Sequence, residues 1–219
     1  MQKAGNSKAV MARLPLYLQC LKGGETAFGE TVSSATIARA LELGEVQVRK
    51  DLAQISGAGR PRIGYVTRDL IRDLENALGC RTTVRAVILG AGKLGSALLH
   101  YDGFEKYGLS VIAAFDRDER KTGDSEGKPV LTVAGFSDFC AGERPEIAIL
   151  TVPESAADAA CELALGAGIR AIWNFSGRRL RVPEGVTVRN ENLALSLAVL
   201  AGQLAADTTQ NLSTKKENA

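Results

Sequence analysis

In the first 80 residues, hydrophobic side chains recur three and four positions apart, which is the spacing of one face of a helix. The pattern predicts a first helix that ends at Gly23. Ser33 and Ser34 offer an N-cap for a second helix over residues 35–41, and a third helix is expected over residues 45–55. The second and third helices together have the pattern of a helix-turn-helix.

The segment after the third helix, residues 57–65, has the composition of a turn. It holds three glycines, one proline and two arginines, which favours a hairpin or wing. Thr67 is expected to cap a fourth helix, which ends at Gly79. These elements predict a winged-helix DNA-binding domain over residues 1–80.

From residue 84 the pattern changes to apolar runs that alternate with helical segments. Helices are expected over residues 93–101 and 156–165, and strands over residues 84–89, 109–115, 129–133, 147–152, 171–175 and 186–189. Continuous apolar strands that alternate with helices indicate a parallel sheet covered on both faces. The sequence therefore predicts an α/β protein whose residues 81–192 form a Rossmann-like, doubly wound domain.

The last predicted helix, residues 193–206, has no polar face. Its apolar side chains spread around most of the circumference: Leu193, Leu195, Leu197, Val199, Leu200 and Leu204. Burial against a second subunit would explain this distribution, and it predicts a homodimer with a C-terminal dimerisation helix. Packing within the same subunit is the alternative. The polar tail over residues 207–219 is expected to be disordered.

Composition excludes several classes of protein. No apolar run reaches the roughly 18 residues of a membrane span, and the first ten residues lack the apolar core of a secretory signal. The four cysteines include no C-x-x-C pair, which argues against a metal site or a disulfide framework. Reduced thiols and a cytoplasmic location are the expectation.

Charge differs between the two halves, although the net charge is only +2. Residues 1–83 carry 12 Lys+Arg against 8 Asp+Glu, whereas residues 84–219 carry 15 against 17. The basic half is the half with the helix-turn-helix pattern, as a nucleic-acid partner requires.

A glycine-rich motif directly follows the first strand of the second domain and opens its first helix: Gly90-Ala91-Gly92-Lys93-Leu94-Gly95. In this context Gly90 permits a tight turn, Gly92 lets the backbone approach a pyrophosphate, and Gly95 lets the helix pack closely on the strand. The helix N-terminus supplies amide donors to the phosphates. The motif predicts a dinucleotide site.

The second strand of this domain ends in Asp116, 26 positions after Gly90. A carboxylate there hydrogen-bonds the adenine-ribose hydroxyls and repels a 2′-phosphate, which favours NAD over NADP. Arg117 and Arg120 lie nearby and temper that preference. Two later strand ends are candidates for the nicotinamide side of the pocket: Thr151-Val152-Pro153 and Asn174-Phe175.

Residues for hydride-transfer catalysis are missing from the pattern. The only histidine, His100, falls late in the first Rossmann helix, and no Tyr-x-x-x-Lys pair occurs. The chain is therefore predicted to bind a dinucleotide without using it, with no catalytic residue and no metal site. An NAD-dependent oxidoreductase with an accessory N-terminal domain is one alternative. A nucleotide-binding scaffold whose winged helix contacts protein is another.

The predicted recognition helix and the wing supply the candidate DNA contacts. Gln47 is placed to reach a base edge, and Arg49 and Lys50 can reach bases or phosphates. Arg60 and Arg62 in the wing can enter the minor groove or hold phosphates. Core packing is the expected role of three apolar positions on the same helix, Val48, Leu52 and Ile55.

Taken in order, these motifs resemble the Rex family of redox-sensing transcriptional repressors over residues 9–206. Among the stretches that carry the resemblance are Arg13-Leu14-Pro15-Leu16-Tyr17-Leu18, Gln47-Val48-Arg49-Lys50-Asp51-Leu52, Gly64-Tyr65, Tyr101-Asp102-Gly103-Phe104 and Val182-Pro183-Glu184-Gly185-Val186. The resemblance implies a homodimer with swapped C-terminal helices and an A·T-rich inverted repeat as the DNA target. It also implies that NADH releases the DNA and that NAD⁺ permits binding.

Motif and resemblance together define three sets of candidate residues. The expected cofactor-binding set is Gly90, Ala91, Gly92, Lys93, Leu94, Gly95, Tyr101, Asp116, Arg117, Lys121, Thr151, Val152, Pro153, Asn174 and Phe175. The expected DNA-binding set is Arg13, Ser33, Ser34, Gln47, Arg49, Lys50, Arg60, Arg62 and Tyr65. The switch that the resemblance implies involves Gln19, Tyr101, Asn192 and Leu193.

The switch residues depart from the family pattern. Gln19 stands where the family usually has Arg, and Asn192-Leu193 where it usually has Asp-Phe. In the family that Asp interacts with the Arg or with the tyrosine that matches Tyr101, depending on redox state, and the Phe closes the nicotinamide pocket. Both charged partners are neutral amides here, a consistent double change because loss of one alone would strand a charge. A weakened or altered switch is the resulting hypothesis.

Overall fold

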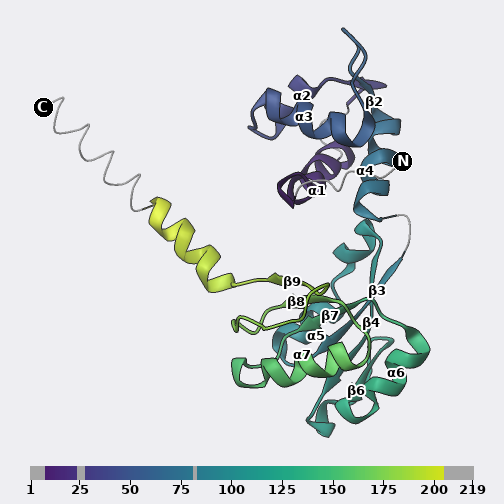
Figure 1. Ribbon diagram of the computed structural model, residues 1–219, viewed down its shortest axis with the longest axis vertical. Coiled ribbons are helices and arrows are strands. Elements are labelled where there is room, and N and C mark those ends of the chain that lie inside the picture. The colour runs from purple at the N-terminus through teal and green to yellow at the C-terminus, as the bar shows by residue number, and fades with distance from the viewer. Residues whose placement is uncertain (1–7, 24–27, 81–82, 205–219) are drawn as a thin grey trace, which may run out of the picture. The chain divides into compact units, whose positions relative to one another are not determined.

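The computed structural model describes residues 8–23, 28–80 and 83–204 of the chain (Figure 1). It divides into two compact units. The first comprises residues up to Val84 together with Asp102–Ser110, and the second comprises Arg85–Tyr101 and the residues from Val111 onward.

The first unit is a four-helix winged-helix module. Its elements are α1 (Lys8–Lys22), β1 (Thr31–Val32), α2 (Ser34–Ala40), α3 (Glu45–Ser56), β2 (Tyr65–Val66) and α4 (Thr67–Leu78). Strands β1 and β2 pair antiparallel, and Gly79 ends α4 in the left-handed conformation with φ 75°. The four predicted helices and their apolar faces are confirmed, since the fully buried side chains include Leu14, Leu18, Ile37, Leu52, Leu70 and Leu74.

Two features of this unit differ from the sequence expectation. Thr67 is the first residue of α4, whose N-cap is Val66, so Thr67 does not cap the helix with its side chain. Its hydroxyl instead donates to the Gly29 carbonyl oxygen at 2.7 Å, which fastens α4 to the segment before β1. The 3₁₀-helix η1 (Asp102–Tyr107), distant in sequence, also belongs to this unit, where Tyr107 packs against the helical core.

The second unit is built on a seven-stranded sheet with the order β5-β6-β4-β3-β7-β8-β9. Its strands are β3 (Val84–Leu89), β4 (Leu109–Asp116), β5 (Gly123–Ser125), β6 (Lys128–Thr132), β7 (Ile147–Leu150), β8 (Ala171–Asn174) and β9 (Thr187–Asn190). The pairs β3–β7, β4–β6, β7–β8 and β8–β9 are parallel, and β5 and β6 form an antiparallel hairpin. The order reverses between β3 and β7, so the carboxyl ends of these strands flank a topological switch point, where ligands of open α/β sheets bind.

The connections of this sheet contain α5 (Lys93–Leu99), α6 (Phe136–Glu143) and α7 (Ala157–Gly166), with short 3₁₀-helices η2 (Glu119–Lys121), η3 (Val133–Gly135) and η4 (Glu154–Ala156). Helix α6 and strand β5 were not predicted, and α5 and β7 are each two residues shorter than expected. Helix α6 is short, and its hydrophobic face is built on Phe136 and Phe139, whose rings meet Phe115 edge-on at 4.9 and 5.3 Å.

Residues 193–204 are helical, as expected, and their apolar side chains are exposed. The exposed fractions run from 57% at Val199 to 68% at Leu204. Packing of this helix within its own subunit, the alternative considered above, is therefore not what the structure shows. Residues 205–219, which include the predicted end of the helix and the tail, lie outside the described residues.

Candidate dinucleotide pocket and DNA-binding surface

The glycine motif forms the turn between β3 and α5. Gly90 has φ 106°, and a Cβ atom on it would lie 2.9–3.0 Å from the backbone of Thr151 and Val152. A Cβ atom on Gly95 would overlap the Gly90 carbonyl oxygen. The Thr151 hydroxyl donates to that same oxygen at 2.6 Å. The loops after β3 and β7 are thus in backbone contact, and only glycine fits at these two positions of the motif.

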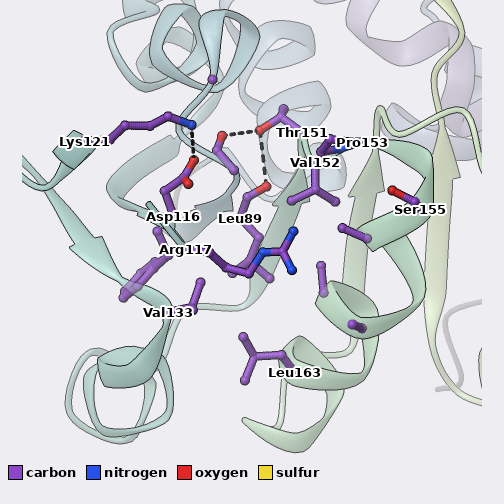
Figure 2. A pocket seen from close by; sticks show the side chains of 16 residues that line it. Leu89, Asp116, Arg117, Lys121, Val133, Thr151, Val152, Pro153, Ser155 and Leu163 are labelled. Atoms are coloured by element: carbon purple, nitrogen blue, oxygen red, sulfur yellow. Dashed lines mark hydrogen bonds and ion pairs between the residues drawn. The ribbon is translucent and has the colours of Figure 1, made fainter. Parts of the chain in front are cut away.

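A pocket of about 740 Å³ opens at this edge of the sheet (Figure 2). This volume is within the range of small-molecule and cofactor sites. The pocket is lined by Leu89, Gly90, Gly92, Phe115, Asp116, Arg117, Lys121, Val133, Thr151, Val152, Pro153, Ser155, Ala156, Ala159, Ala160 and Leu163.

Asp116 is the fixed negative charge of the pocket. Its Oδ2 atom accepts hydrogen bonds from the Ala91 amide and the Lys121 ammonium, both at 2.8 Å, and its Oδ1 atom accepts one from the Asp118 amide at 2.9 Å. Burial opposes ionisation, but the hydrogen bonds from Lys121 and the two amides outweigh it and lower the pKa of Asp116. Asp116 is consequently an anion at neutral pH, as acceptance of ribose hydroxyls requires.

The two arginines near Asp116 are arranged differently. Arg120 forms an ion pair with Asp118 through Nη2 at 2.8 Å, and its side chain is 90% exposed. Arg117 lines the pocket, and Figure 2 shows its side chain extending into the pocket rather than toward Asp116. The pocket thus combines one carboxylate with two cations, Arg117 and Lys121.

The structure brings eight of the predicted cofactor residues together around this pocket: Gly90, Gly92, Asp116, Arg117, Lys121, Thr151, Val152 and Pro153. Ala91 contributes its amide to Asp116, and Gly95 acts through close packing. Lys93 and Leu94 form the start of α5, and they do not line the pocket.

Three predicted cofactor residues lie elsewhere in the second unit. Asn174 lines a second, smaller pocket with Asn190 and Asn192, and its Nδ2 donates to the Asn190 Oδ1 atom at 2.8 Å. Phe175 packs edge-on against Trp173 with ring centroids 4.6 Å apart. Tyr101 is 58% exposed and does not line either pocket.

The α7 side of the pocket was not predicted. It consists of small or apolar residues, namely Ser155 and Ala156 of η4 and Ala159, Ala160 and Leu163 of α7, together with Val133 after β6. The signal in the sequence was the alanine-rich start of the helix after β7, where small side chains at positions three and four apart share a face.

The candidate DNA-binding surface lies on the first unit. Gln47, Arg49 and Lys50 are exposed on α3, whereas Val48 and Leu52 are buried, as expected. Arg60 and Arg62 are exposed on the wing, where Arg60 and Gly64 form an isolated antiparallel bridge.

Arg13 is tied to the inner face of α3. Its Nε and Nη2 atoms donate to the two Asp51 oxygens at 2.7 and 2.9 Å, and the Tyr17 hydroxyl donates to Asp51 Oδ2 at 2.7 Å. Asp51 is 3% exposed, and although burial opposes its ionisation, the hydrogen bonds from Arg13 and Tyr17 lower its pKa. Burial, followed by Asp51, raises the pKa of Tyr17 to about 12. Arg13 therefore has a partner within its own domain, and the pair connects α1 to α3.

Two further residues of the predicted DNA set support the domain from within. Ser33 caps α2, with its Oγ accepting from the Thr36 amide at 3.0 Å. Tyr65 is 7% exposed, and its ring lies so close to Gly59 that a Cβ atom there would be 3.0 Å away. Ser34, the first residue of α2, is half-buried.

Three residues of the predicted switch, Gln19, Asn192 and Leu193, have local roles or are exposed in the structure. Gln19 is exposed on α1, and its backbone carbonyl accepts from the Gly23 amide at 2.7 Å. Asn192 Oδ1 accepts from the Leu195 amide at 2.9 Å, which caps the last helix. Leu193 is 64% exposed.

Comparison with known proteins assigns the chain to a family. Residues 7–53 match the family model of a putative DNA-binding protein N-terminus, and residues 81–177 match that of a CoA binding domain. A redox-sensing transcriptional repressor Rex from Treponema denticola is 42% identical over 189 residues, which is 86% of this chain and 90% of the relative. This chain belongs to the Rex family. The Rex of Porphyromonas gingivalis W83 is 39% identical over 195 residues, 89% of each chain.

Solved Rex-family structures have the same fold. A crystal structure of RSP in complex with β-NAD⁺ and operator DNA has a TM-score of 0.85 at 32% identity and covers 97% of this chain and 98% of its own. RSP in complex with β-NADH has a TM-score of 0.83, again at 32% identity, over 94% and 97% of the two chains. The predicted fold and class, a transcriptional regulator of the Rex family rather than an enzyme, are confirmed.

The sequence predicts neither a metal site nor a membrane span, and the structure bears on both points for the described residues. Within them, no group of three or more His, Cys, Asp or Glu side chains is placed to hold a metal ion. None of the helices in the described part of the chain is both long enough and apolar enough to cross a bilayer.

Proposed function

We propose that this Rex-family protein binds operator DNA through its first unit and NAD(H) through its second, and that the NADH/NAD⁺ ratio sets its affinity for the operator. The pocket at the switch point of the sheet, with the ionised Asp116 beside the glycine turn, is the observation that carries the proposal. The related protein RSP has been solved with β-NADH, and with β-NAD⁺ and operator DNA.

The described residues fit a dinucleotide. Gly90 and Gly92 bring bare backbone to the pocket, where a pyrophosphate can approach the start of α5. Asp116 can accept the hydroxyls of the adenine ribose, and the small side chains of α7 leave a smooth apolar wall for flat rings. Bound NADH supplies a reduced nicotinamide whose charge differs from that of NAD⁺, and this difference is what a sensor reads.

DNA binding rests on the exposed polar face of α3 and on the wing. Gln47, Arg49 and Lys50 point outward from a helix whose opposite face is buried, which is the arrangement of a recognition helix. We propose an A·T-rich inverted repeat as the target, with NADH releasing it and NAD⁺ permitting binding.

A second copy of this chain is the proposed partner of the exposed C-terminal helix. Six large apolar side chains over residues 193–204 are at least 57% exposed, which a soluble monomer rarely shows on one helix. Two such helices exchanged between subunits would bury them and create the two-fold axis that an inverted repeat requires. We further propose that the neutral Gln19 and Asn192 weaken the coupling between the nucleotide and DNA sites.

The double variant Arg49→Ala/Lys50→Ala separates the repressor from its alternatives. It is expected to lose operator binding in fluorescence anisotropy while NADH binding, followed by nucleotide fluorescence, is unchanged. Retained DNA binding would contradict the placement of α3 in the major groove. Turnover of NADH with a carbonyl substrate would instead support the oxidoreductase alternative.

A further inference from the structure

We propose that Ile63, at the tip of the wing, is an apolar wedge that enters the minor groove of the operator and partly unstacks one base step. The inference rests on the proposed DNA binding and adds a specific mode of contact to it. Ile63 is a large hydrophobic residue that is 51% exposed, and it directly follows the two arginines of the wing, Arg60 and Arg62, in the sequence.

The wing tip is a closed, stiff turn. Arg60 and Gly64 exchange two backbone hydrogen bonds of 2.7 and 2.8 Å, and the Ile63 amide donates to the Arg60 carbonyl at 3.2 Å. Pro61 occupies the first corner, where its ring fixes φ, and Arg62 occupies the second with φ 65°. Ile63 is therefore presented by a turn with little backbone freedom, which lowers the entropic cost of inserting its side chain.

The base of the wing is packed against the rest of the domain. A Cβ atom on Gly64 would overlap the Val32 carbonyl oxygen of β1, so the wing lies directly on that strand. The Tyr65 side chain is buried, with its ring against Gly59 on the other arm of the wing. Because these contacts hold the base of the wing in place, the tip can enter a DNA groove without the wing folding back onto the domain.

Two residues at the wing tip are energetically unfavourable for a turn that only connects two segments of the chain. A left-handed conformation disfavours a side chain such as Arg62, and glycine would adopt it freely. An exposed isoleucine also leaves apolar surface in water. Proteins retain such local costs mainly at functional positions.

The charge and the shape of the wing tip favour the minor groove of a DNA duplex as its binding site. Within the described part of the chain, Arg60 and Arg62 are exposed and no ion pair or side-chain hydrogen bond engages them, so both guanidinium groups are available to phosphates. A narrow A·T-rich minor groove has a strongly negative potential that attracts arginine. Proteins that bind there often insert an apolar side chain between base pairs and kink the duplex.

The test uses the full-length protein and operator duplexes that carry the fluorescent base 2-aminopurine at successive steps of each half-site. Unstacking raises the fluorescence of this base, so wild-type protein is expected to produce a rise at one step per half-site. Ile63→Ser keeps both arginines and the turn; it is expected to abolish the rise and to weaken operator affinity by about tenfold. Ile63→Leu, the matched apolar control, is expected to retain both.

The salt dependence of binding distinguishes the wedge from a general loss of the wing. Because Ile63→Ser leaves the phosphate contacts in place, the slope of affinity against salt is expected to match the wild type. An equal fluorescence rise with Ile63→Ser, or tight wild-type binding with no rise at any step, would overturn the wedge alone. Absence of wild-type binding to any duplex at low salt would overturn the proposed function and the wedge with it.

Discussion

The buried carboxylate of Asp51 gives the sharpest test of how α3, the proposed recognition helix, is held in place. Asp51 accepts three hydrogen bonds, two from Arg13 and one from Tyr17, and is 3% exposed. Asp51→Asn removes the charge and at least one acceptor while it leaves the Arg13 guanidinium in place. Loss of one partner of a buried pair costs about 3–5 kcal/mol, and the Arg13 side chain is 23% exposed, which lets water offset part of the loss. We therefore expect destabilisation of about 3 kcal/mol.

The companion variant Tyr17→Phe removes a single hydrogen bond to the ionised Asp51 carboxylate and is expected to cost about 1.5–3 kcal/mol. Urea unfolding followed by circular dichroism measures both changes, and hydrogen exchange of the α1 and α3 amides assigns them to the first unit. Asp69→Asn is the matched control, because its pair with Arg72 is a helix-surface pair of about 50% exposed side chains. Such a pair contributes at most a few tenths of a kcal/mol.

The same pair has a defined pH dependence. Because the pKa of Asp51 is lowered in the folded state, its contribution is present above the unfolded aspartate pKa of about 3.9 and is lost as the pH falls through the lower folded value. The wild type should lose more stability than Asp51→Asn over this acidic window. Equal stability of wild type and Asp51→Asn at neutral pH would refute the reasoning. An equal loss of stability in the two proteins over the acidic window would also refute it.

Three other variants test the cofactor site, the proposed dimerisation helix and a local pH response. Asp116→Ser is expected to weaken NADH binding and to improve NADPH binding relative to NADH by about tenfold, because Arg117 and Lys121 remain. An unchanged preference between the two nucleotides in fluorescence titration would contradict this. Leu197→Asp should give monomers in analytical ultracentrifugation, whereas a dimer of unchanged stability would exclude this helix from the interface. Both ring nitrogens of His100 lie within 2.9 Å of backbone carbonyl oxygens, which raises its pKa. The stability from these bonds is present below the unfolded histidine pKa of about 6.5 and is lost as the pH rises through the higher folded value. His100→Gln should reduce that loss. A melting temperature that depends on pH between about 5.5 and 8.5 in the same way for wild type and variant would contradict this.

Long amphipathic patterns and the glycine motif carried most of the predictable fold. The faces of α1 and α4, the strands β3 and β4, and the turn at Gly90 follow from periodicity and from steric demands that act locally. Strands β1 and β2 of the first unit have two residues each, too short for a period to register. Helix α6 was missed because its eight residues carry only a weak helical pattern.

Site residues could be predicted where their positions follow from the strand order and the glycine turn. Contacts between side chains far apart in the sequence could not be predicted. Asp116 ends a strand beside the glycine turn, and its place in the pocket follows from topology. Arg13 stays a predicted DNA contact, but its pair with Asp51 could not be predicted, because Asp51 lies 38 positions away in the sequence. The α7 wall of the pocket depends on which face of a helix turns to the sheet edge, and tertiary packing decides that.

The central claim is that the NADH/NAD⁺ ratio sets operator affinity. Fluorescence anisotropy of a labelled A·T-rich inverted-repeat duplex, saturated with wild-type protein and then titrated with NADH or NAD⁺, tests it directly. The account predicts tight binding that NADH reverses selectively, over a smaller range than charged switch residues would give. Binding that responds equally to both nucleotides, or to neither, would contradict the redox coupling while leaving the DNA-binding surface intact.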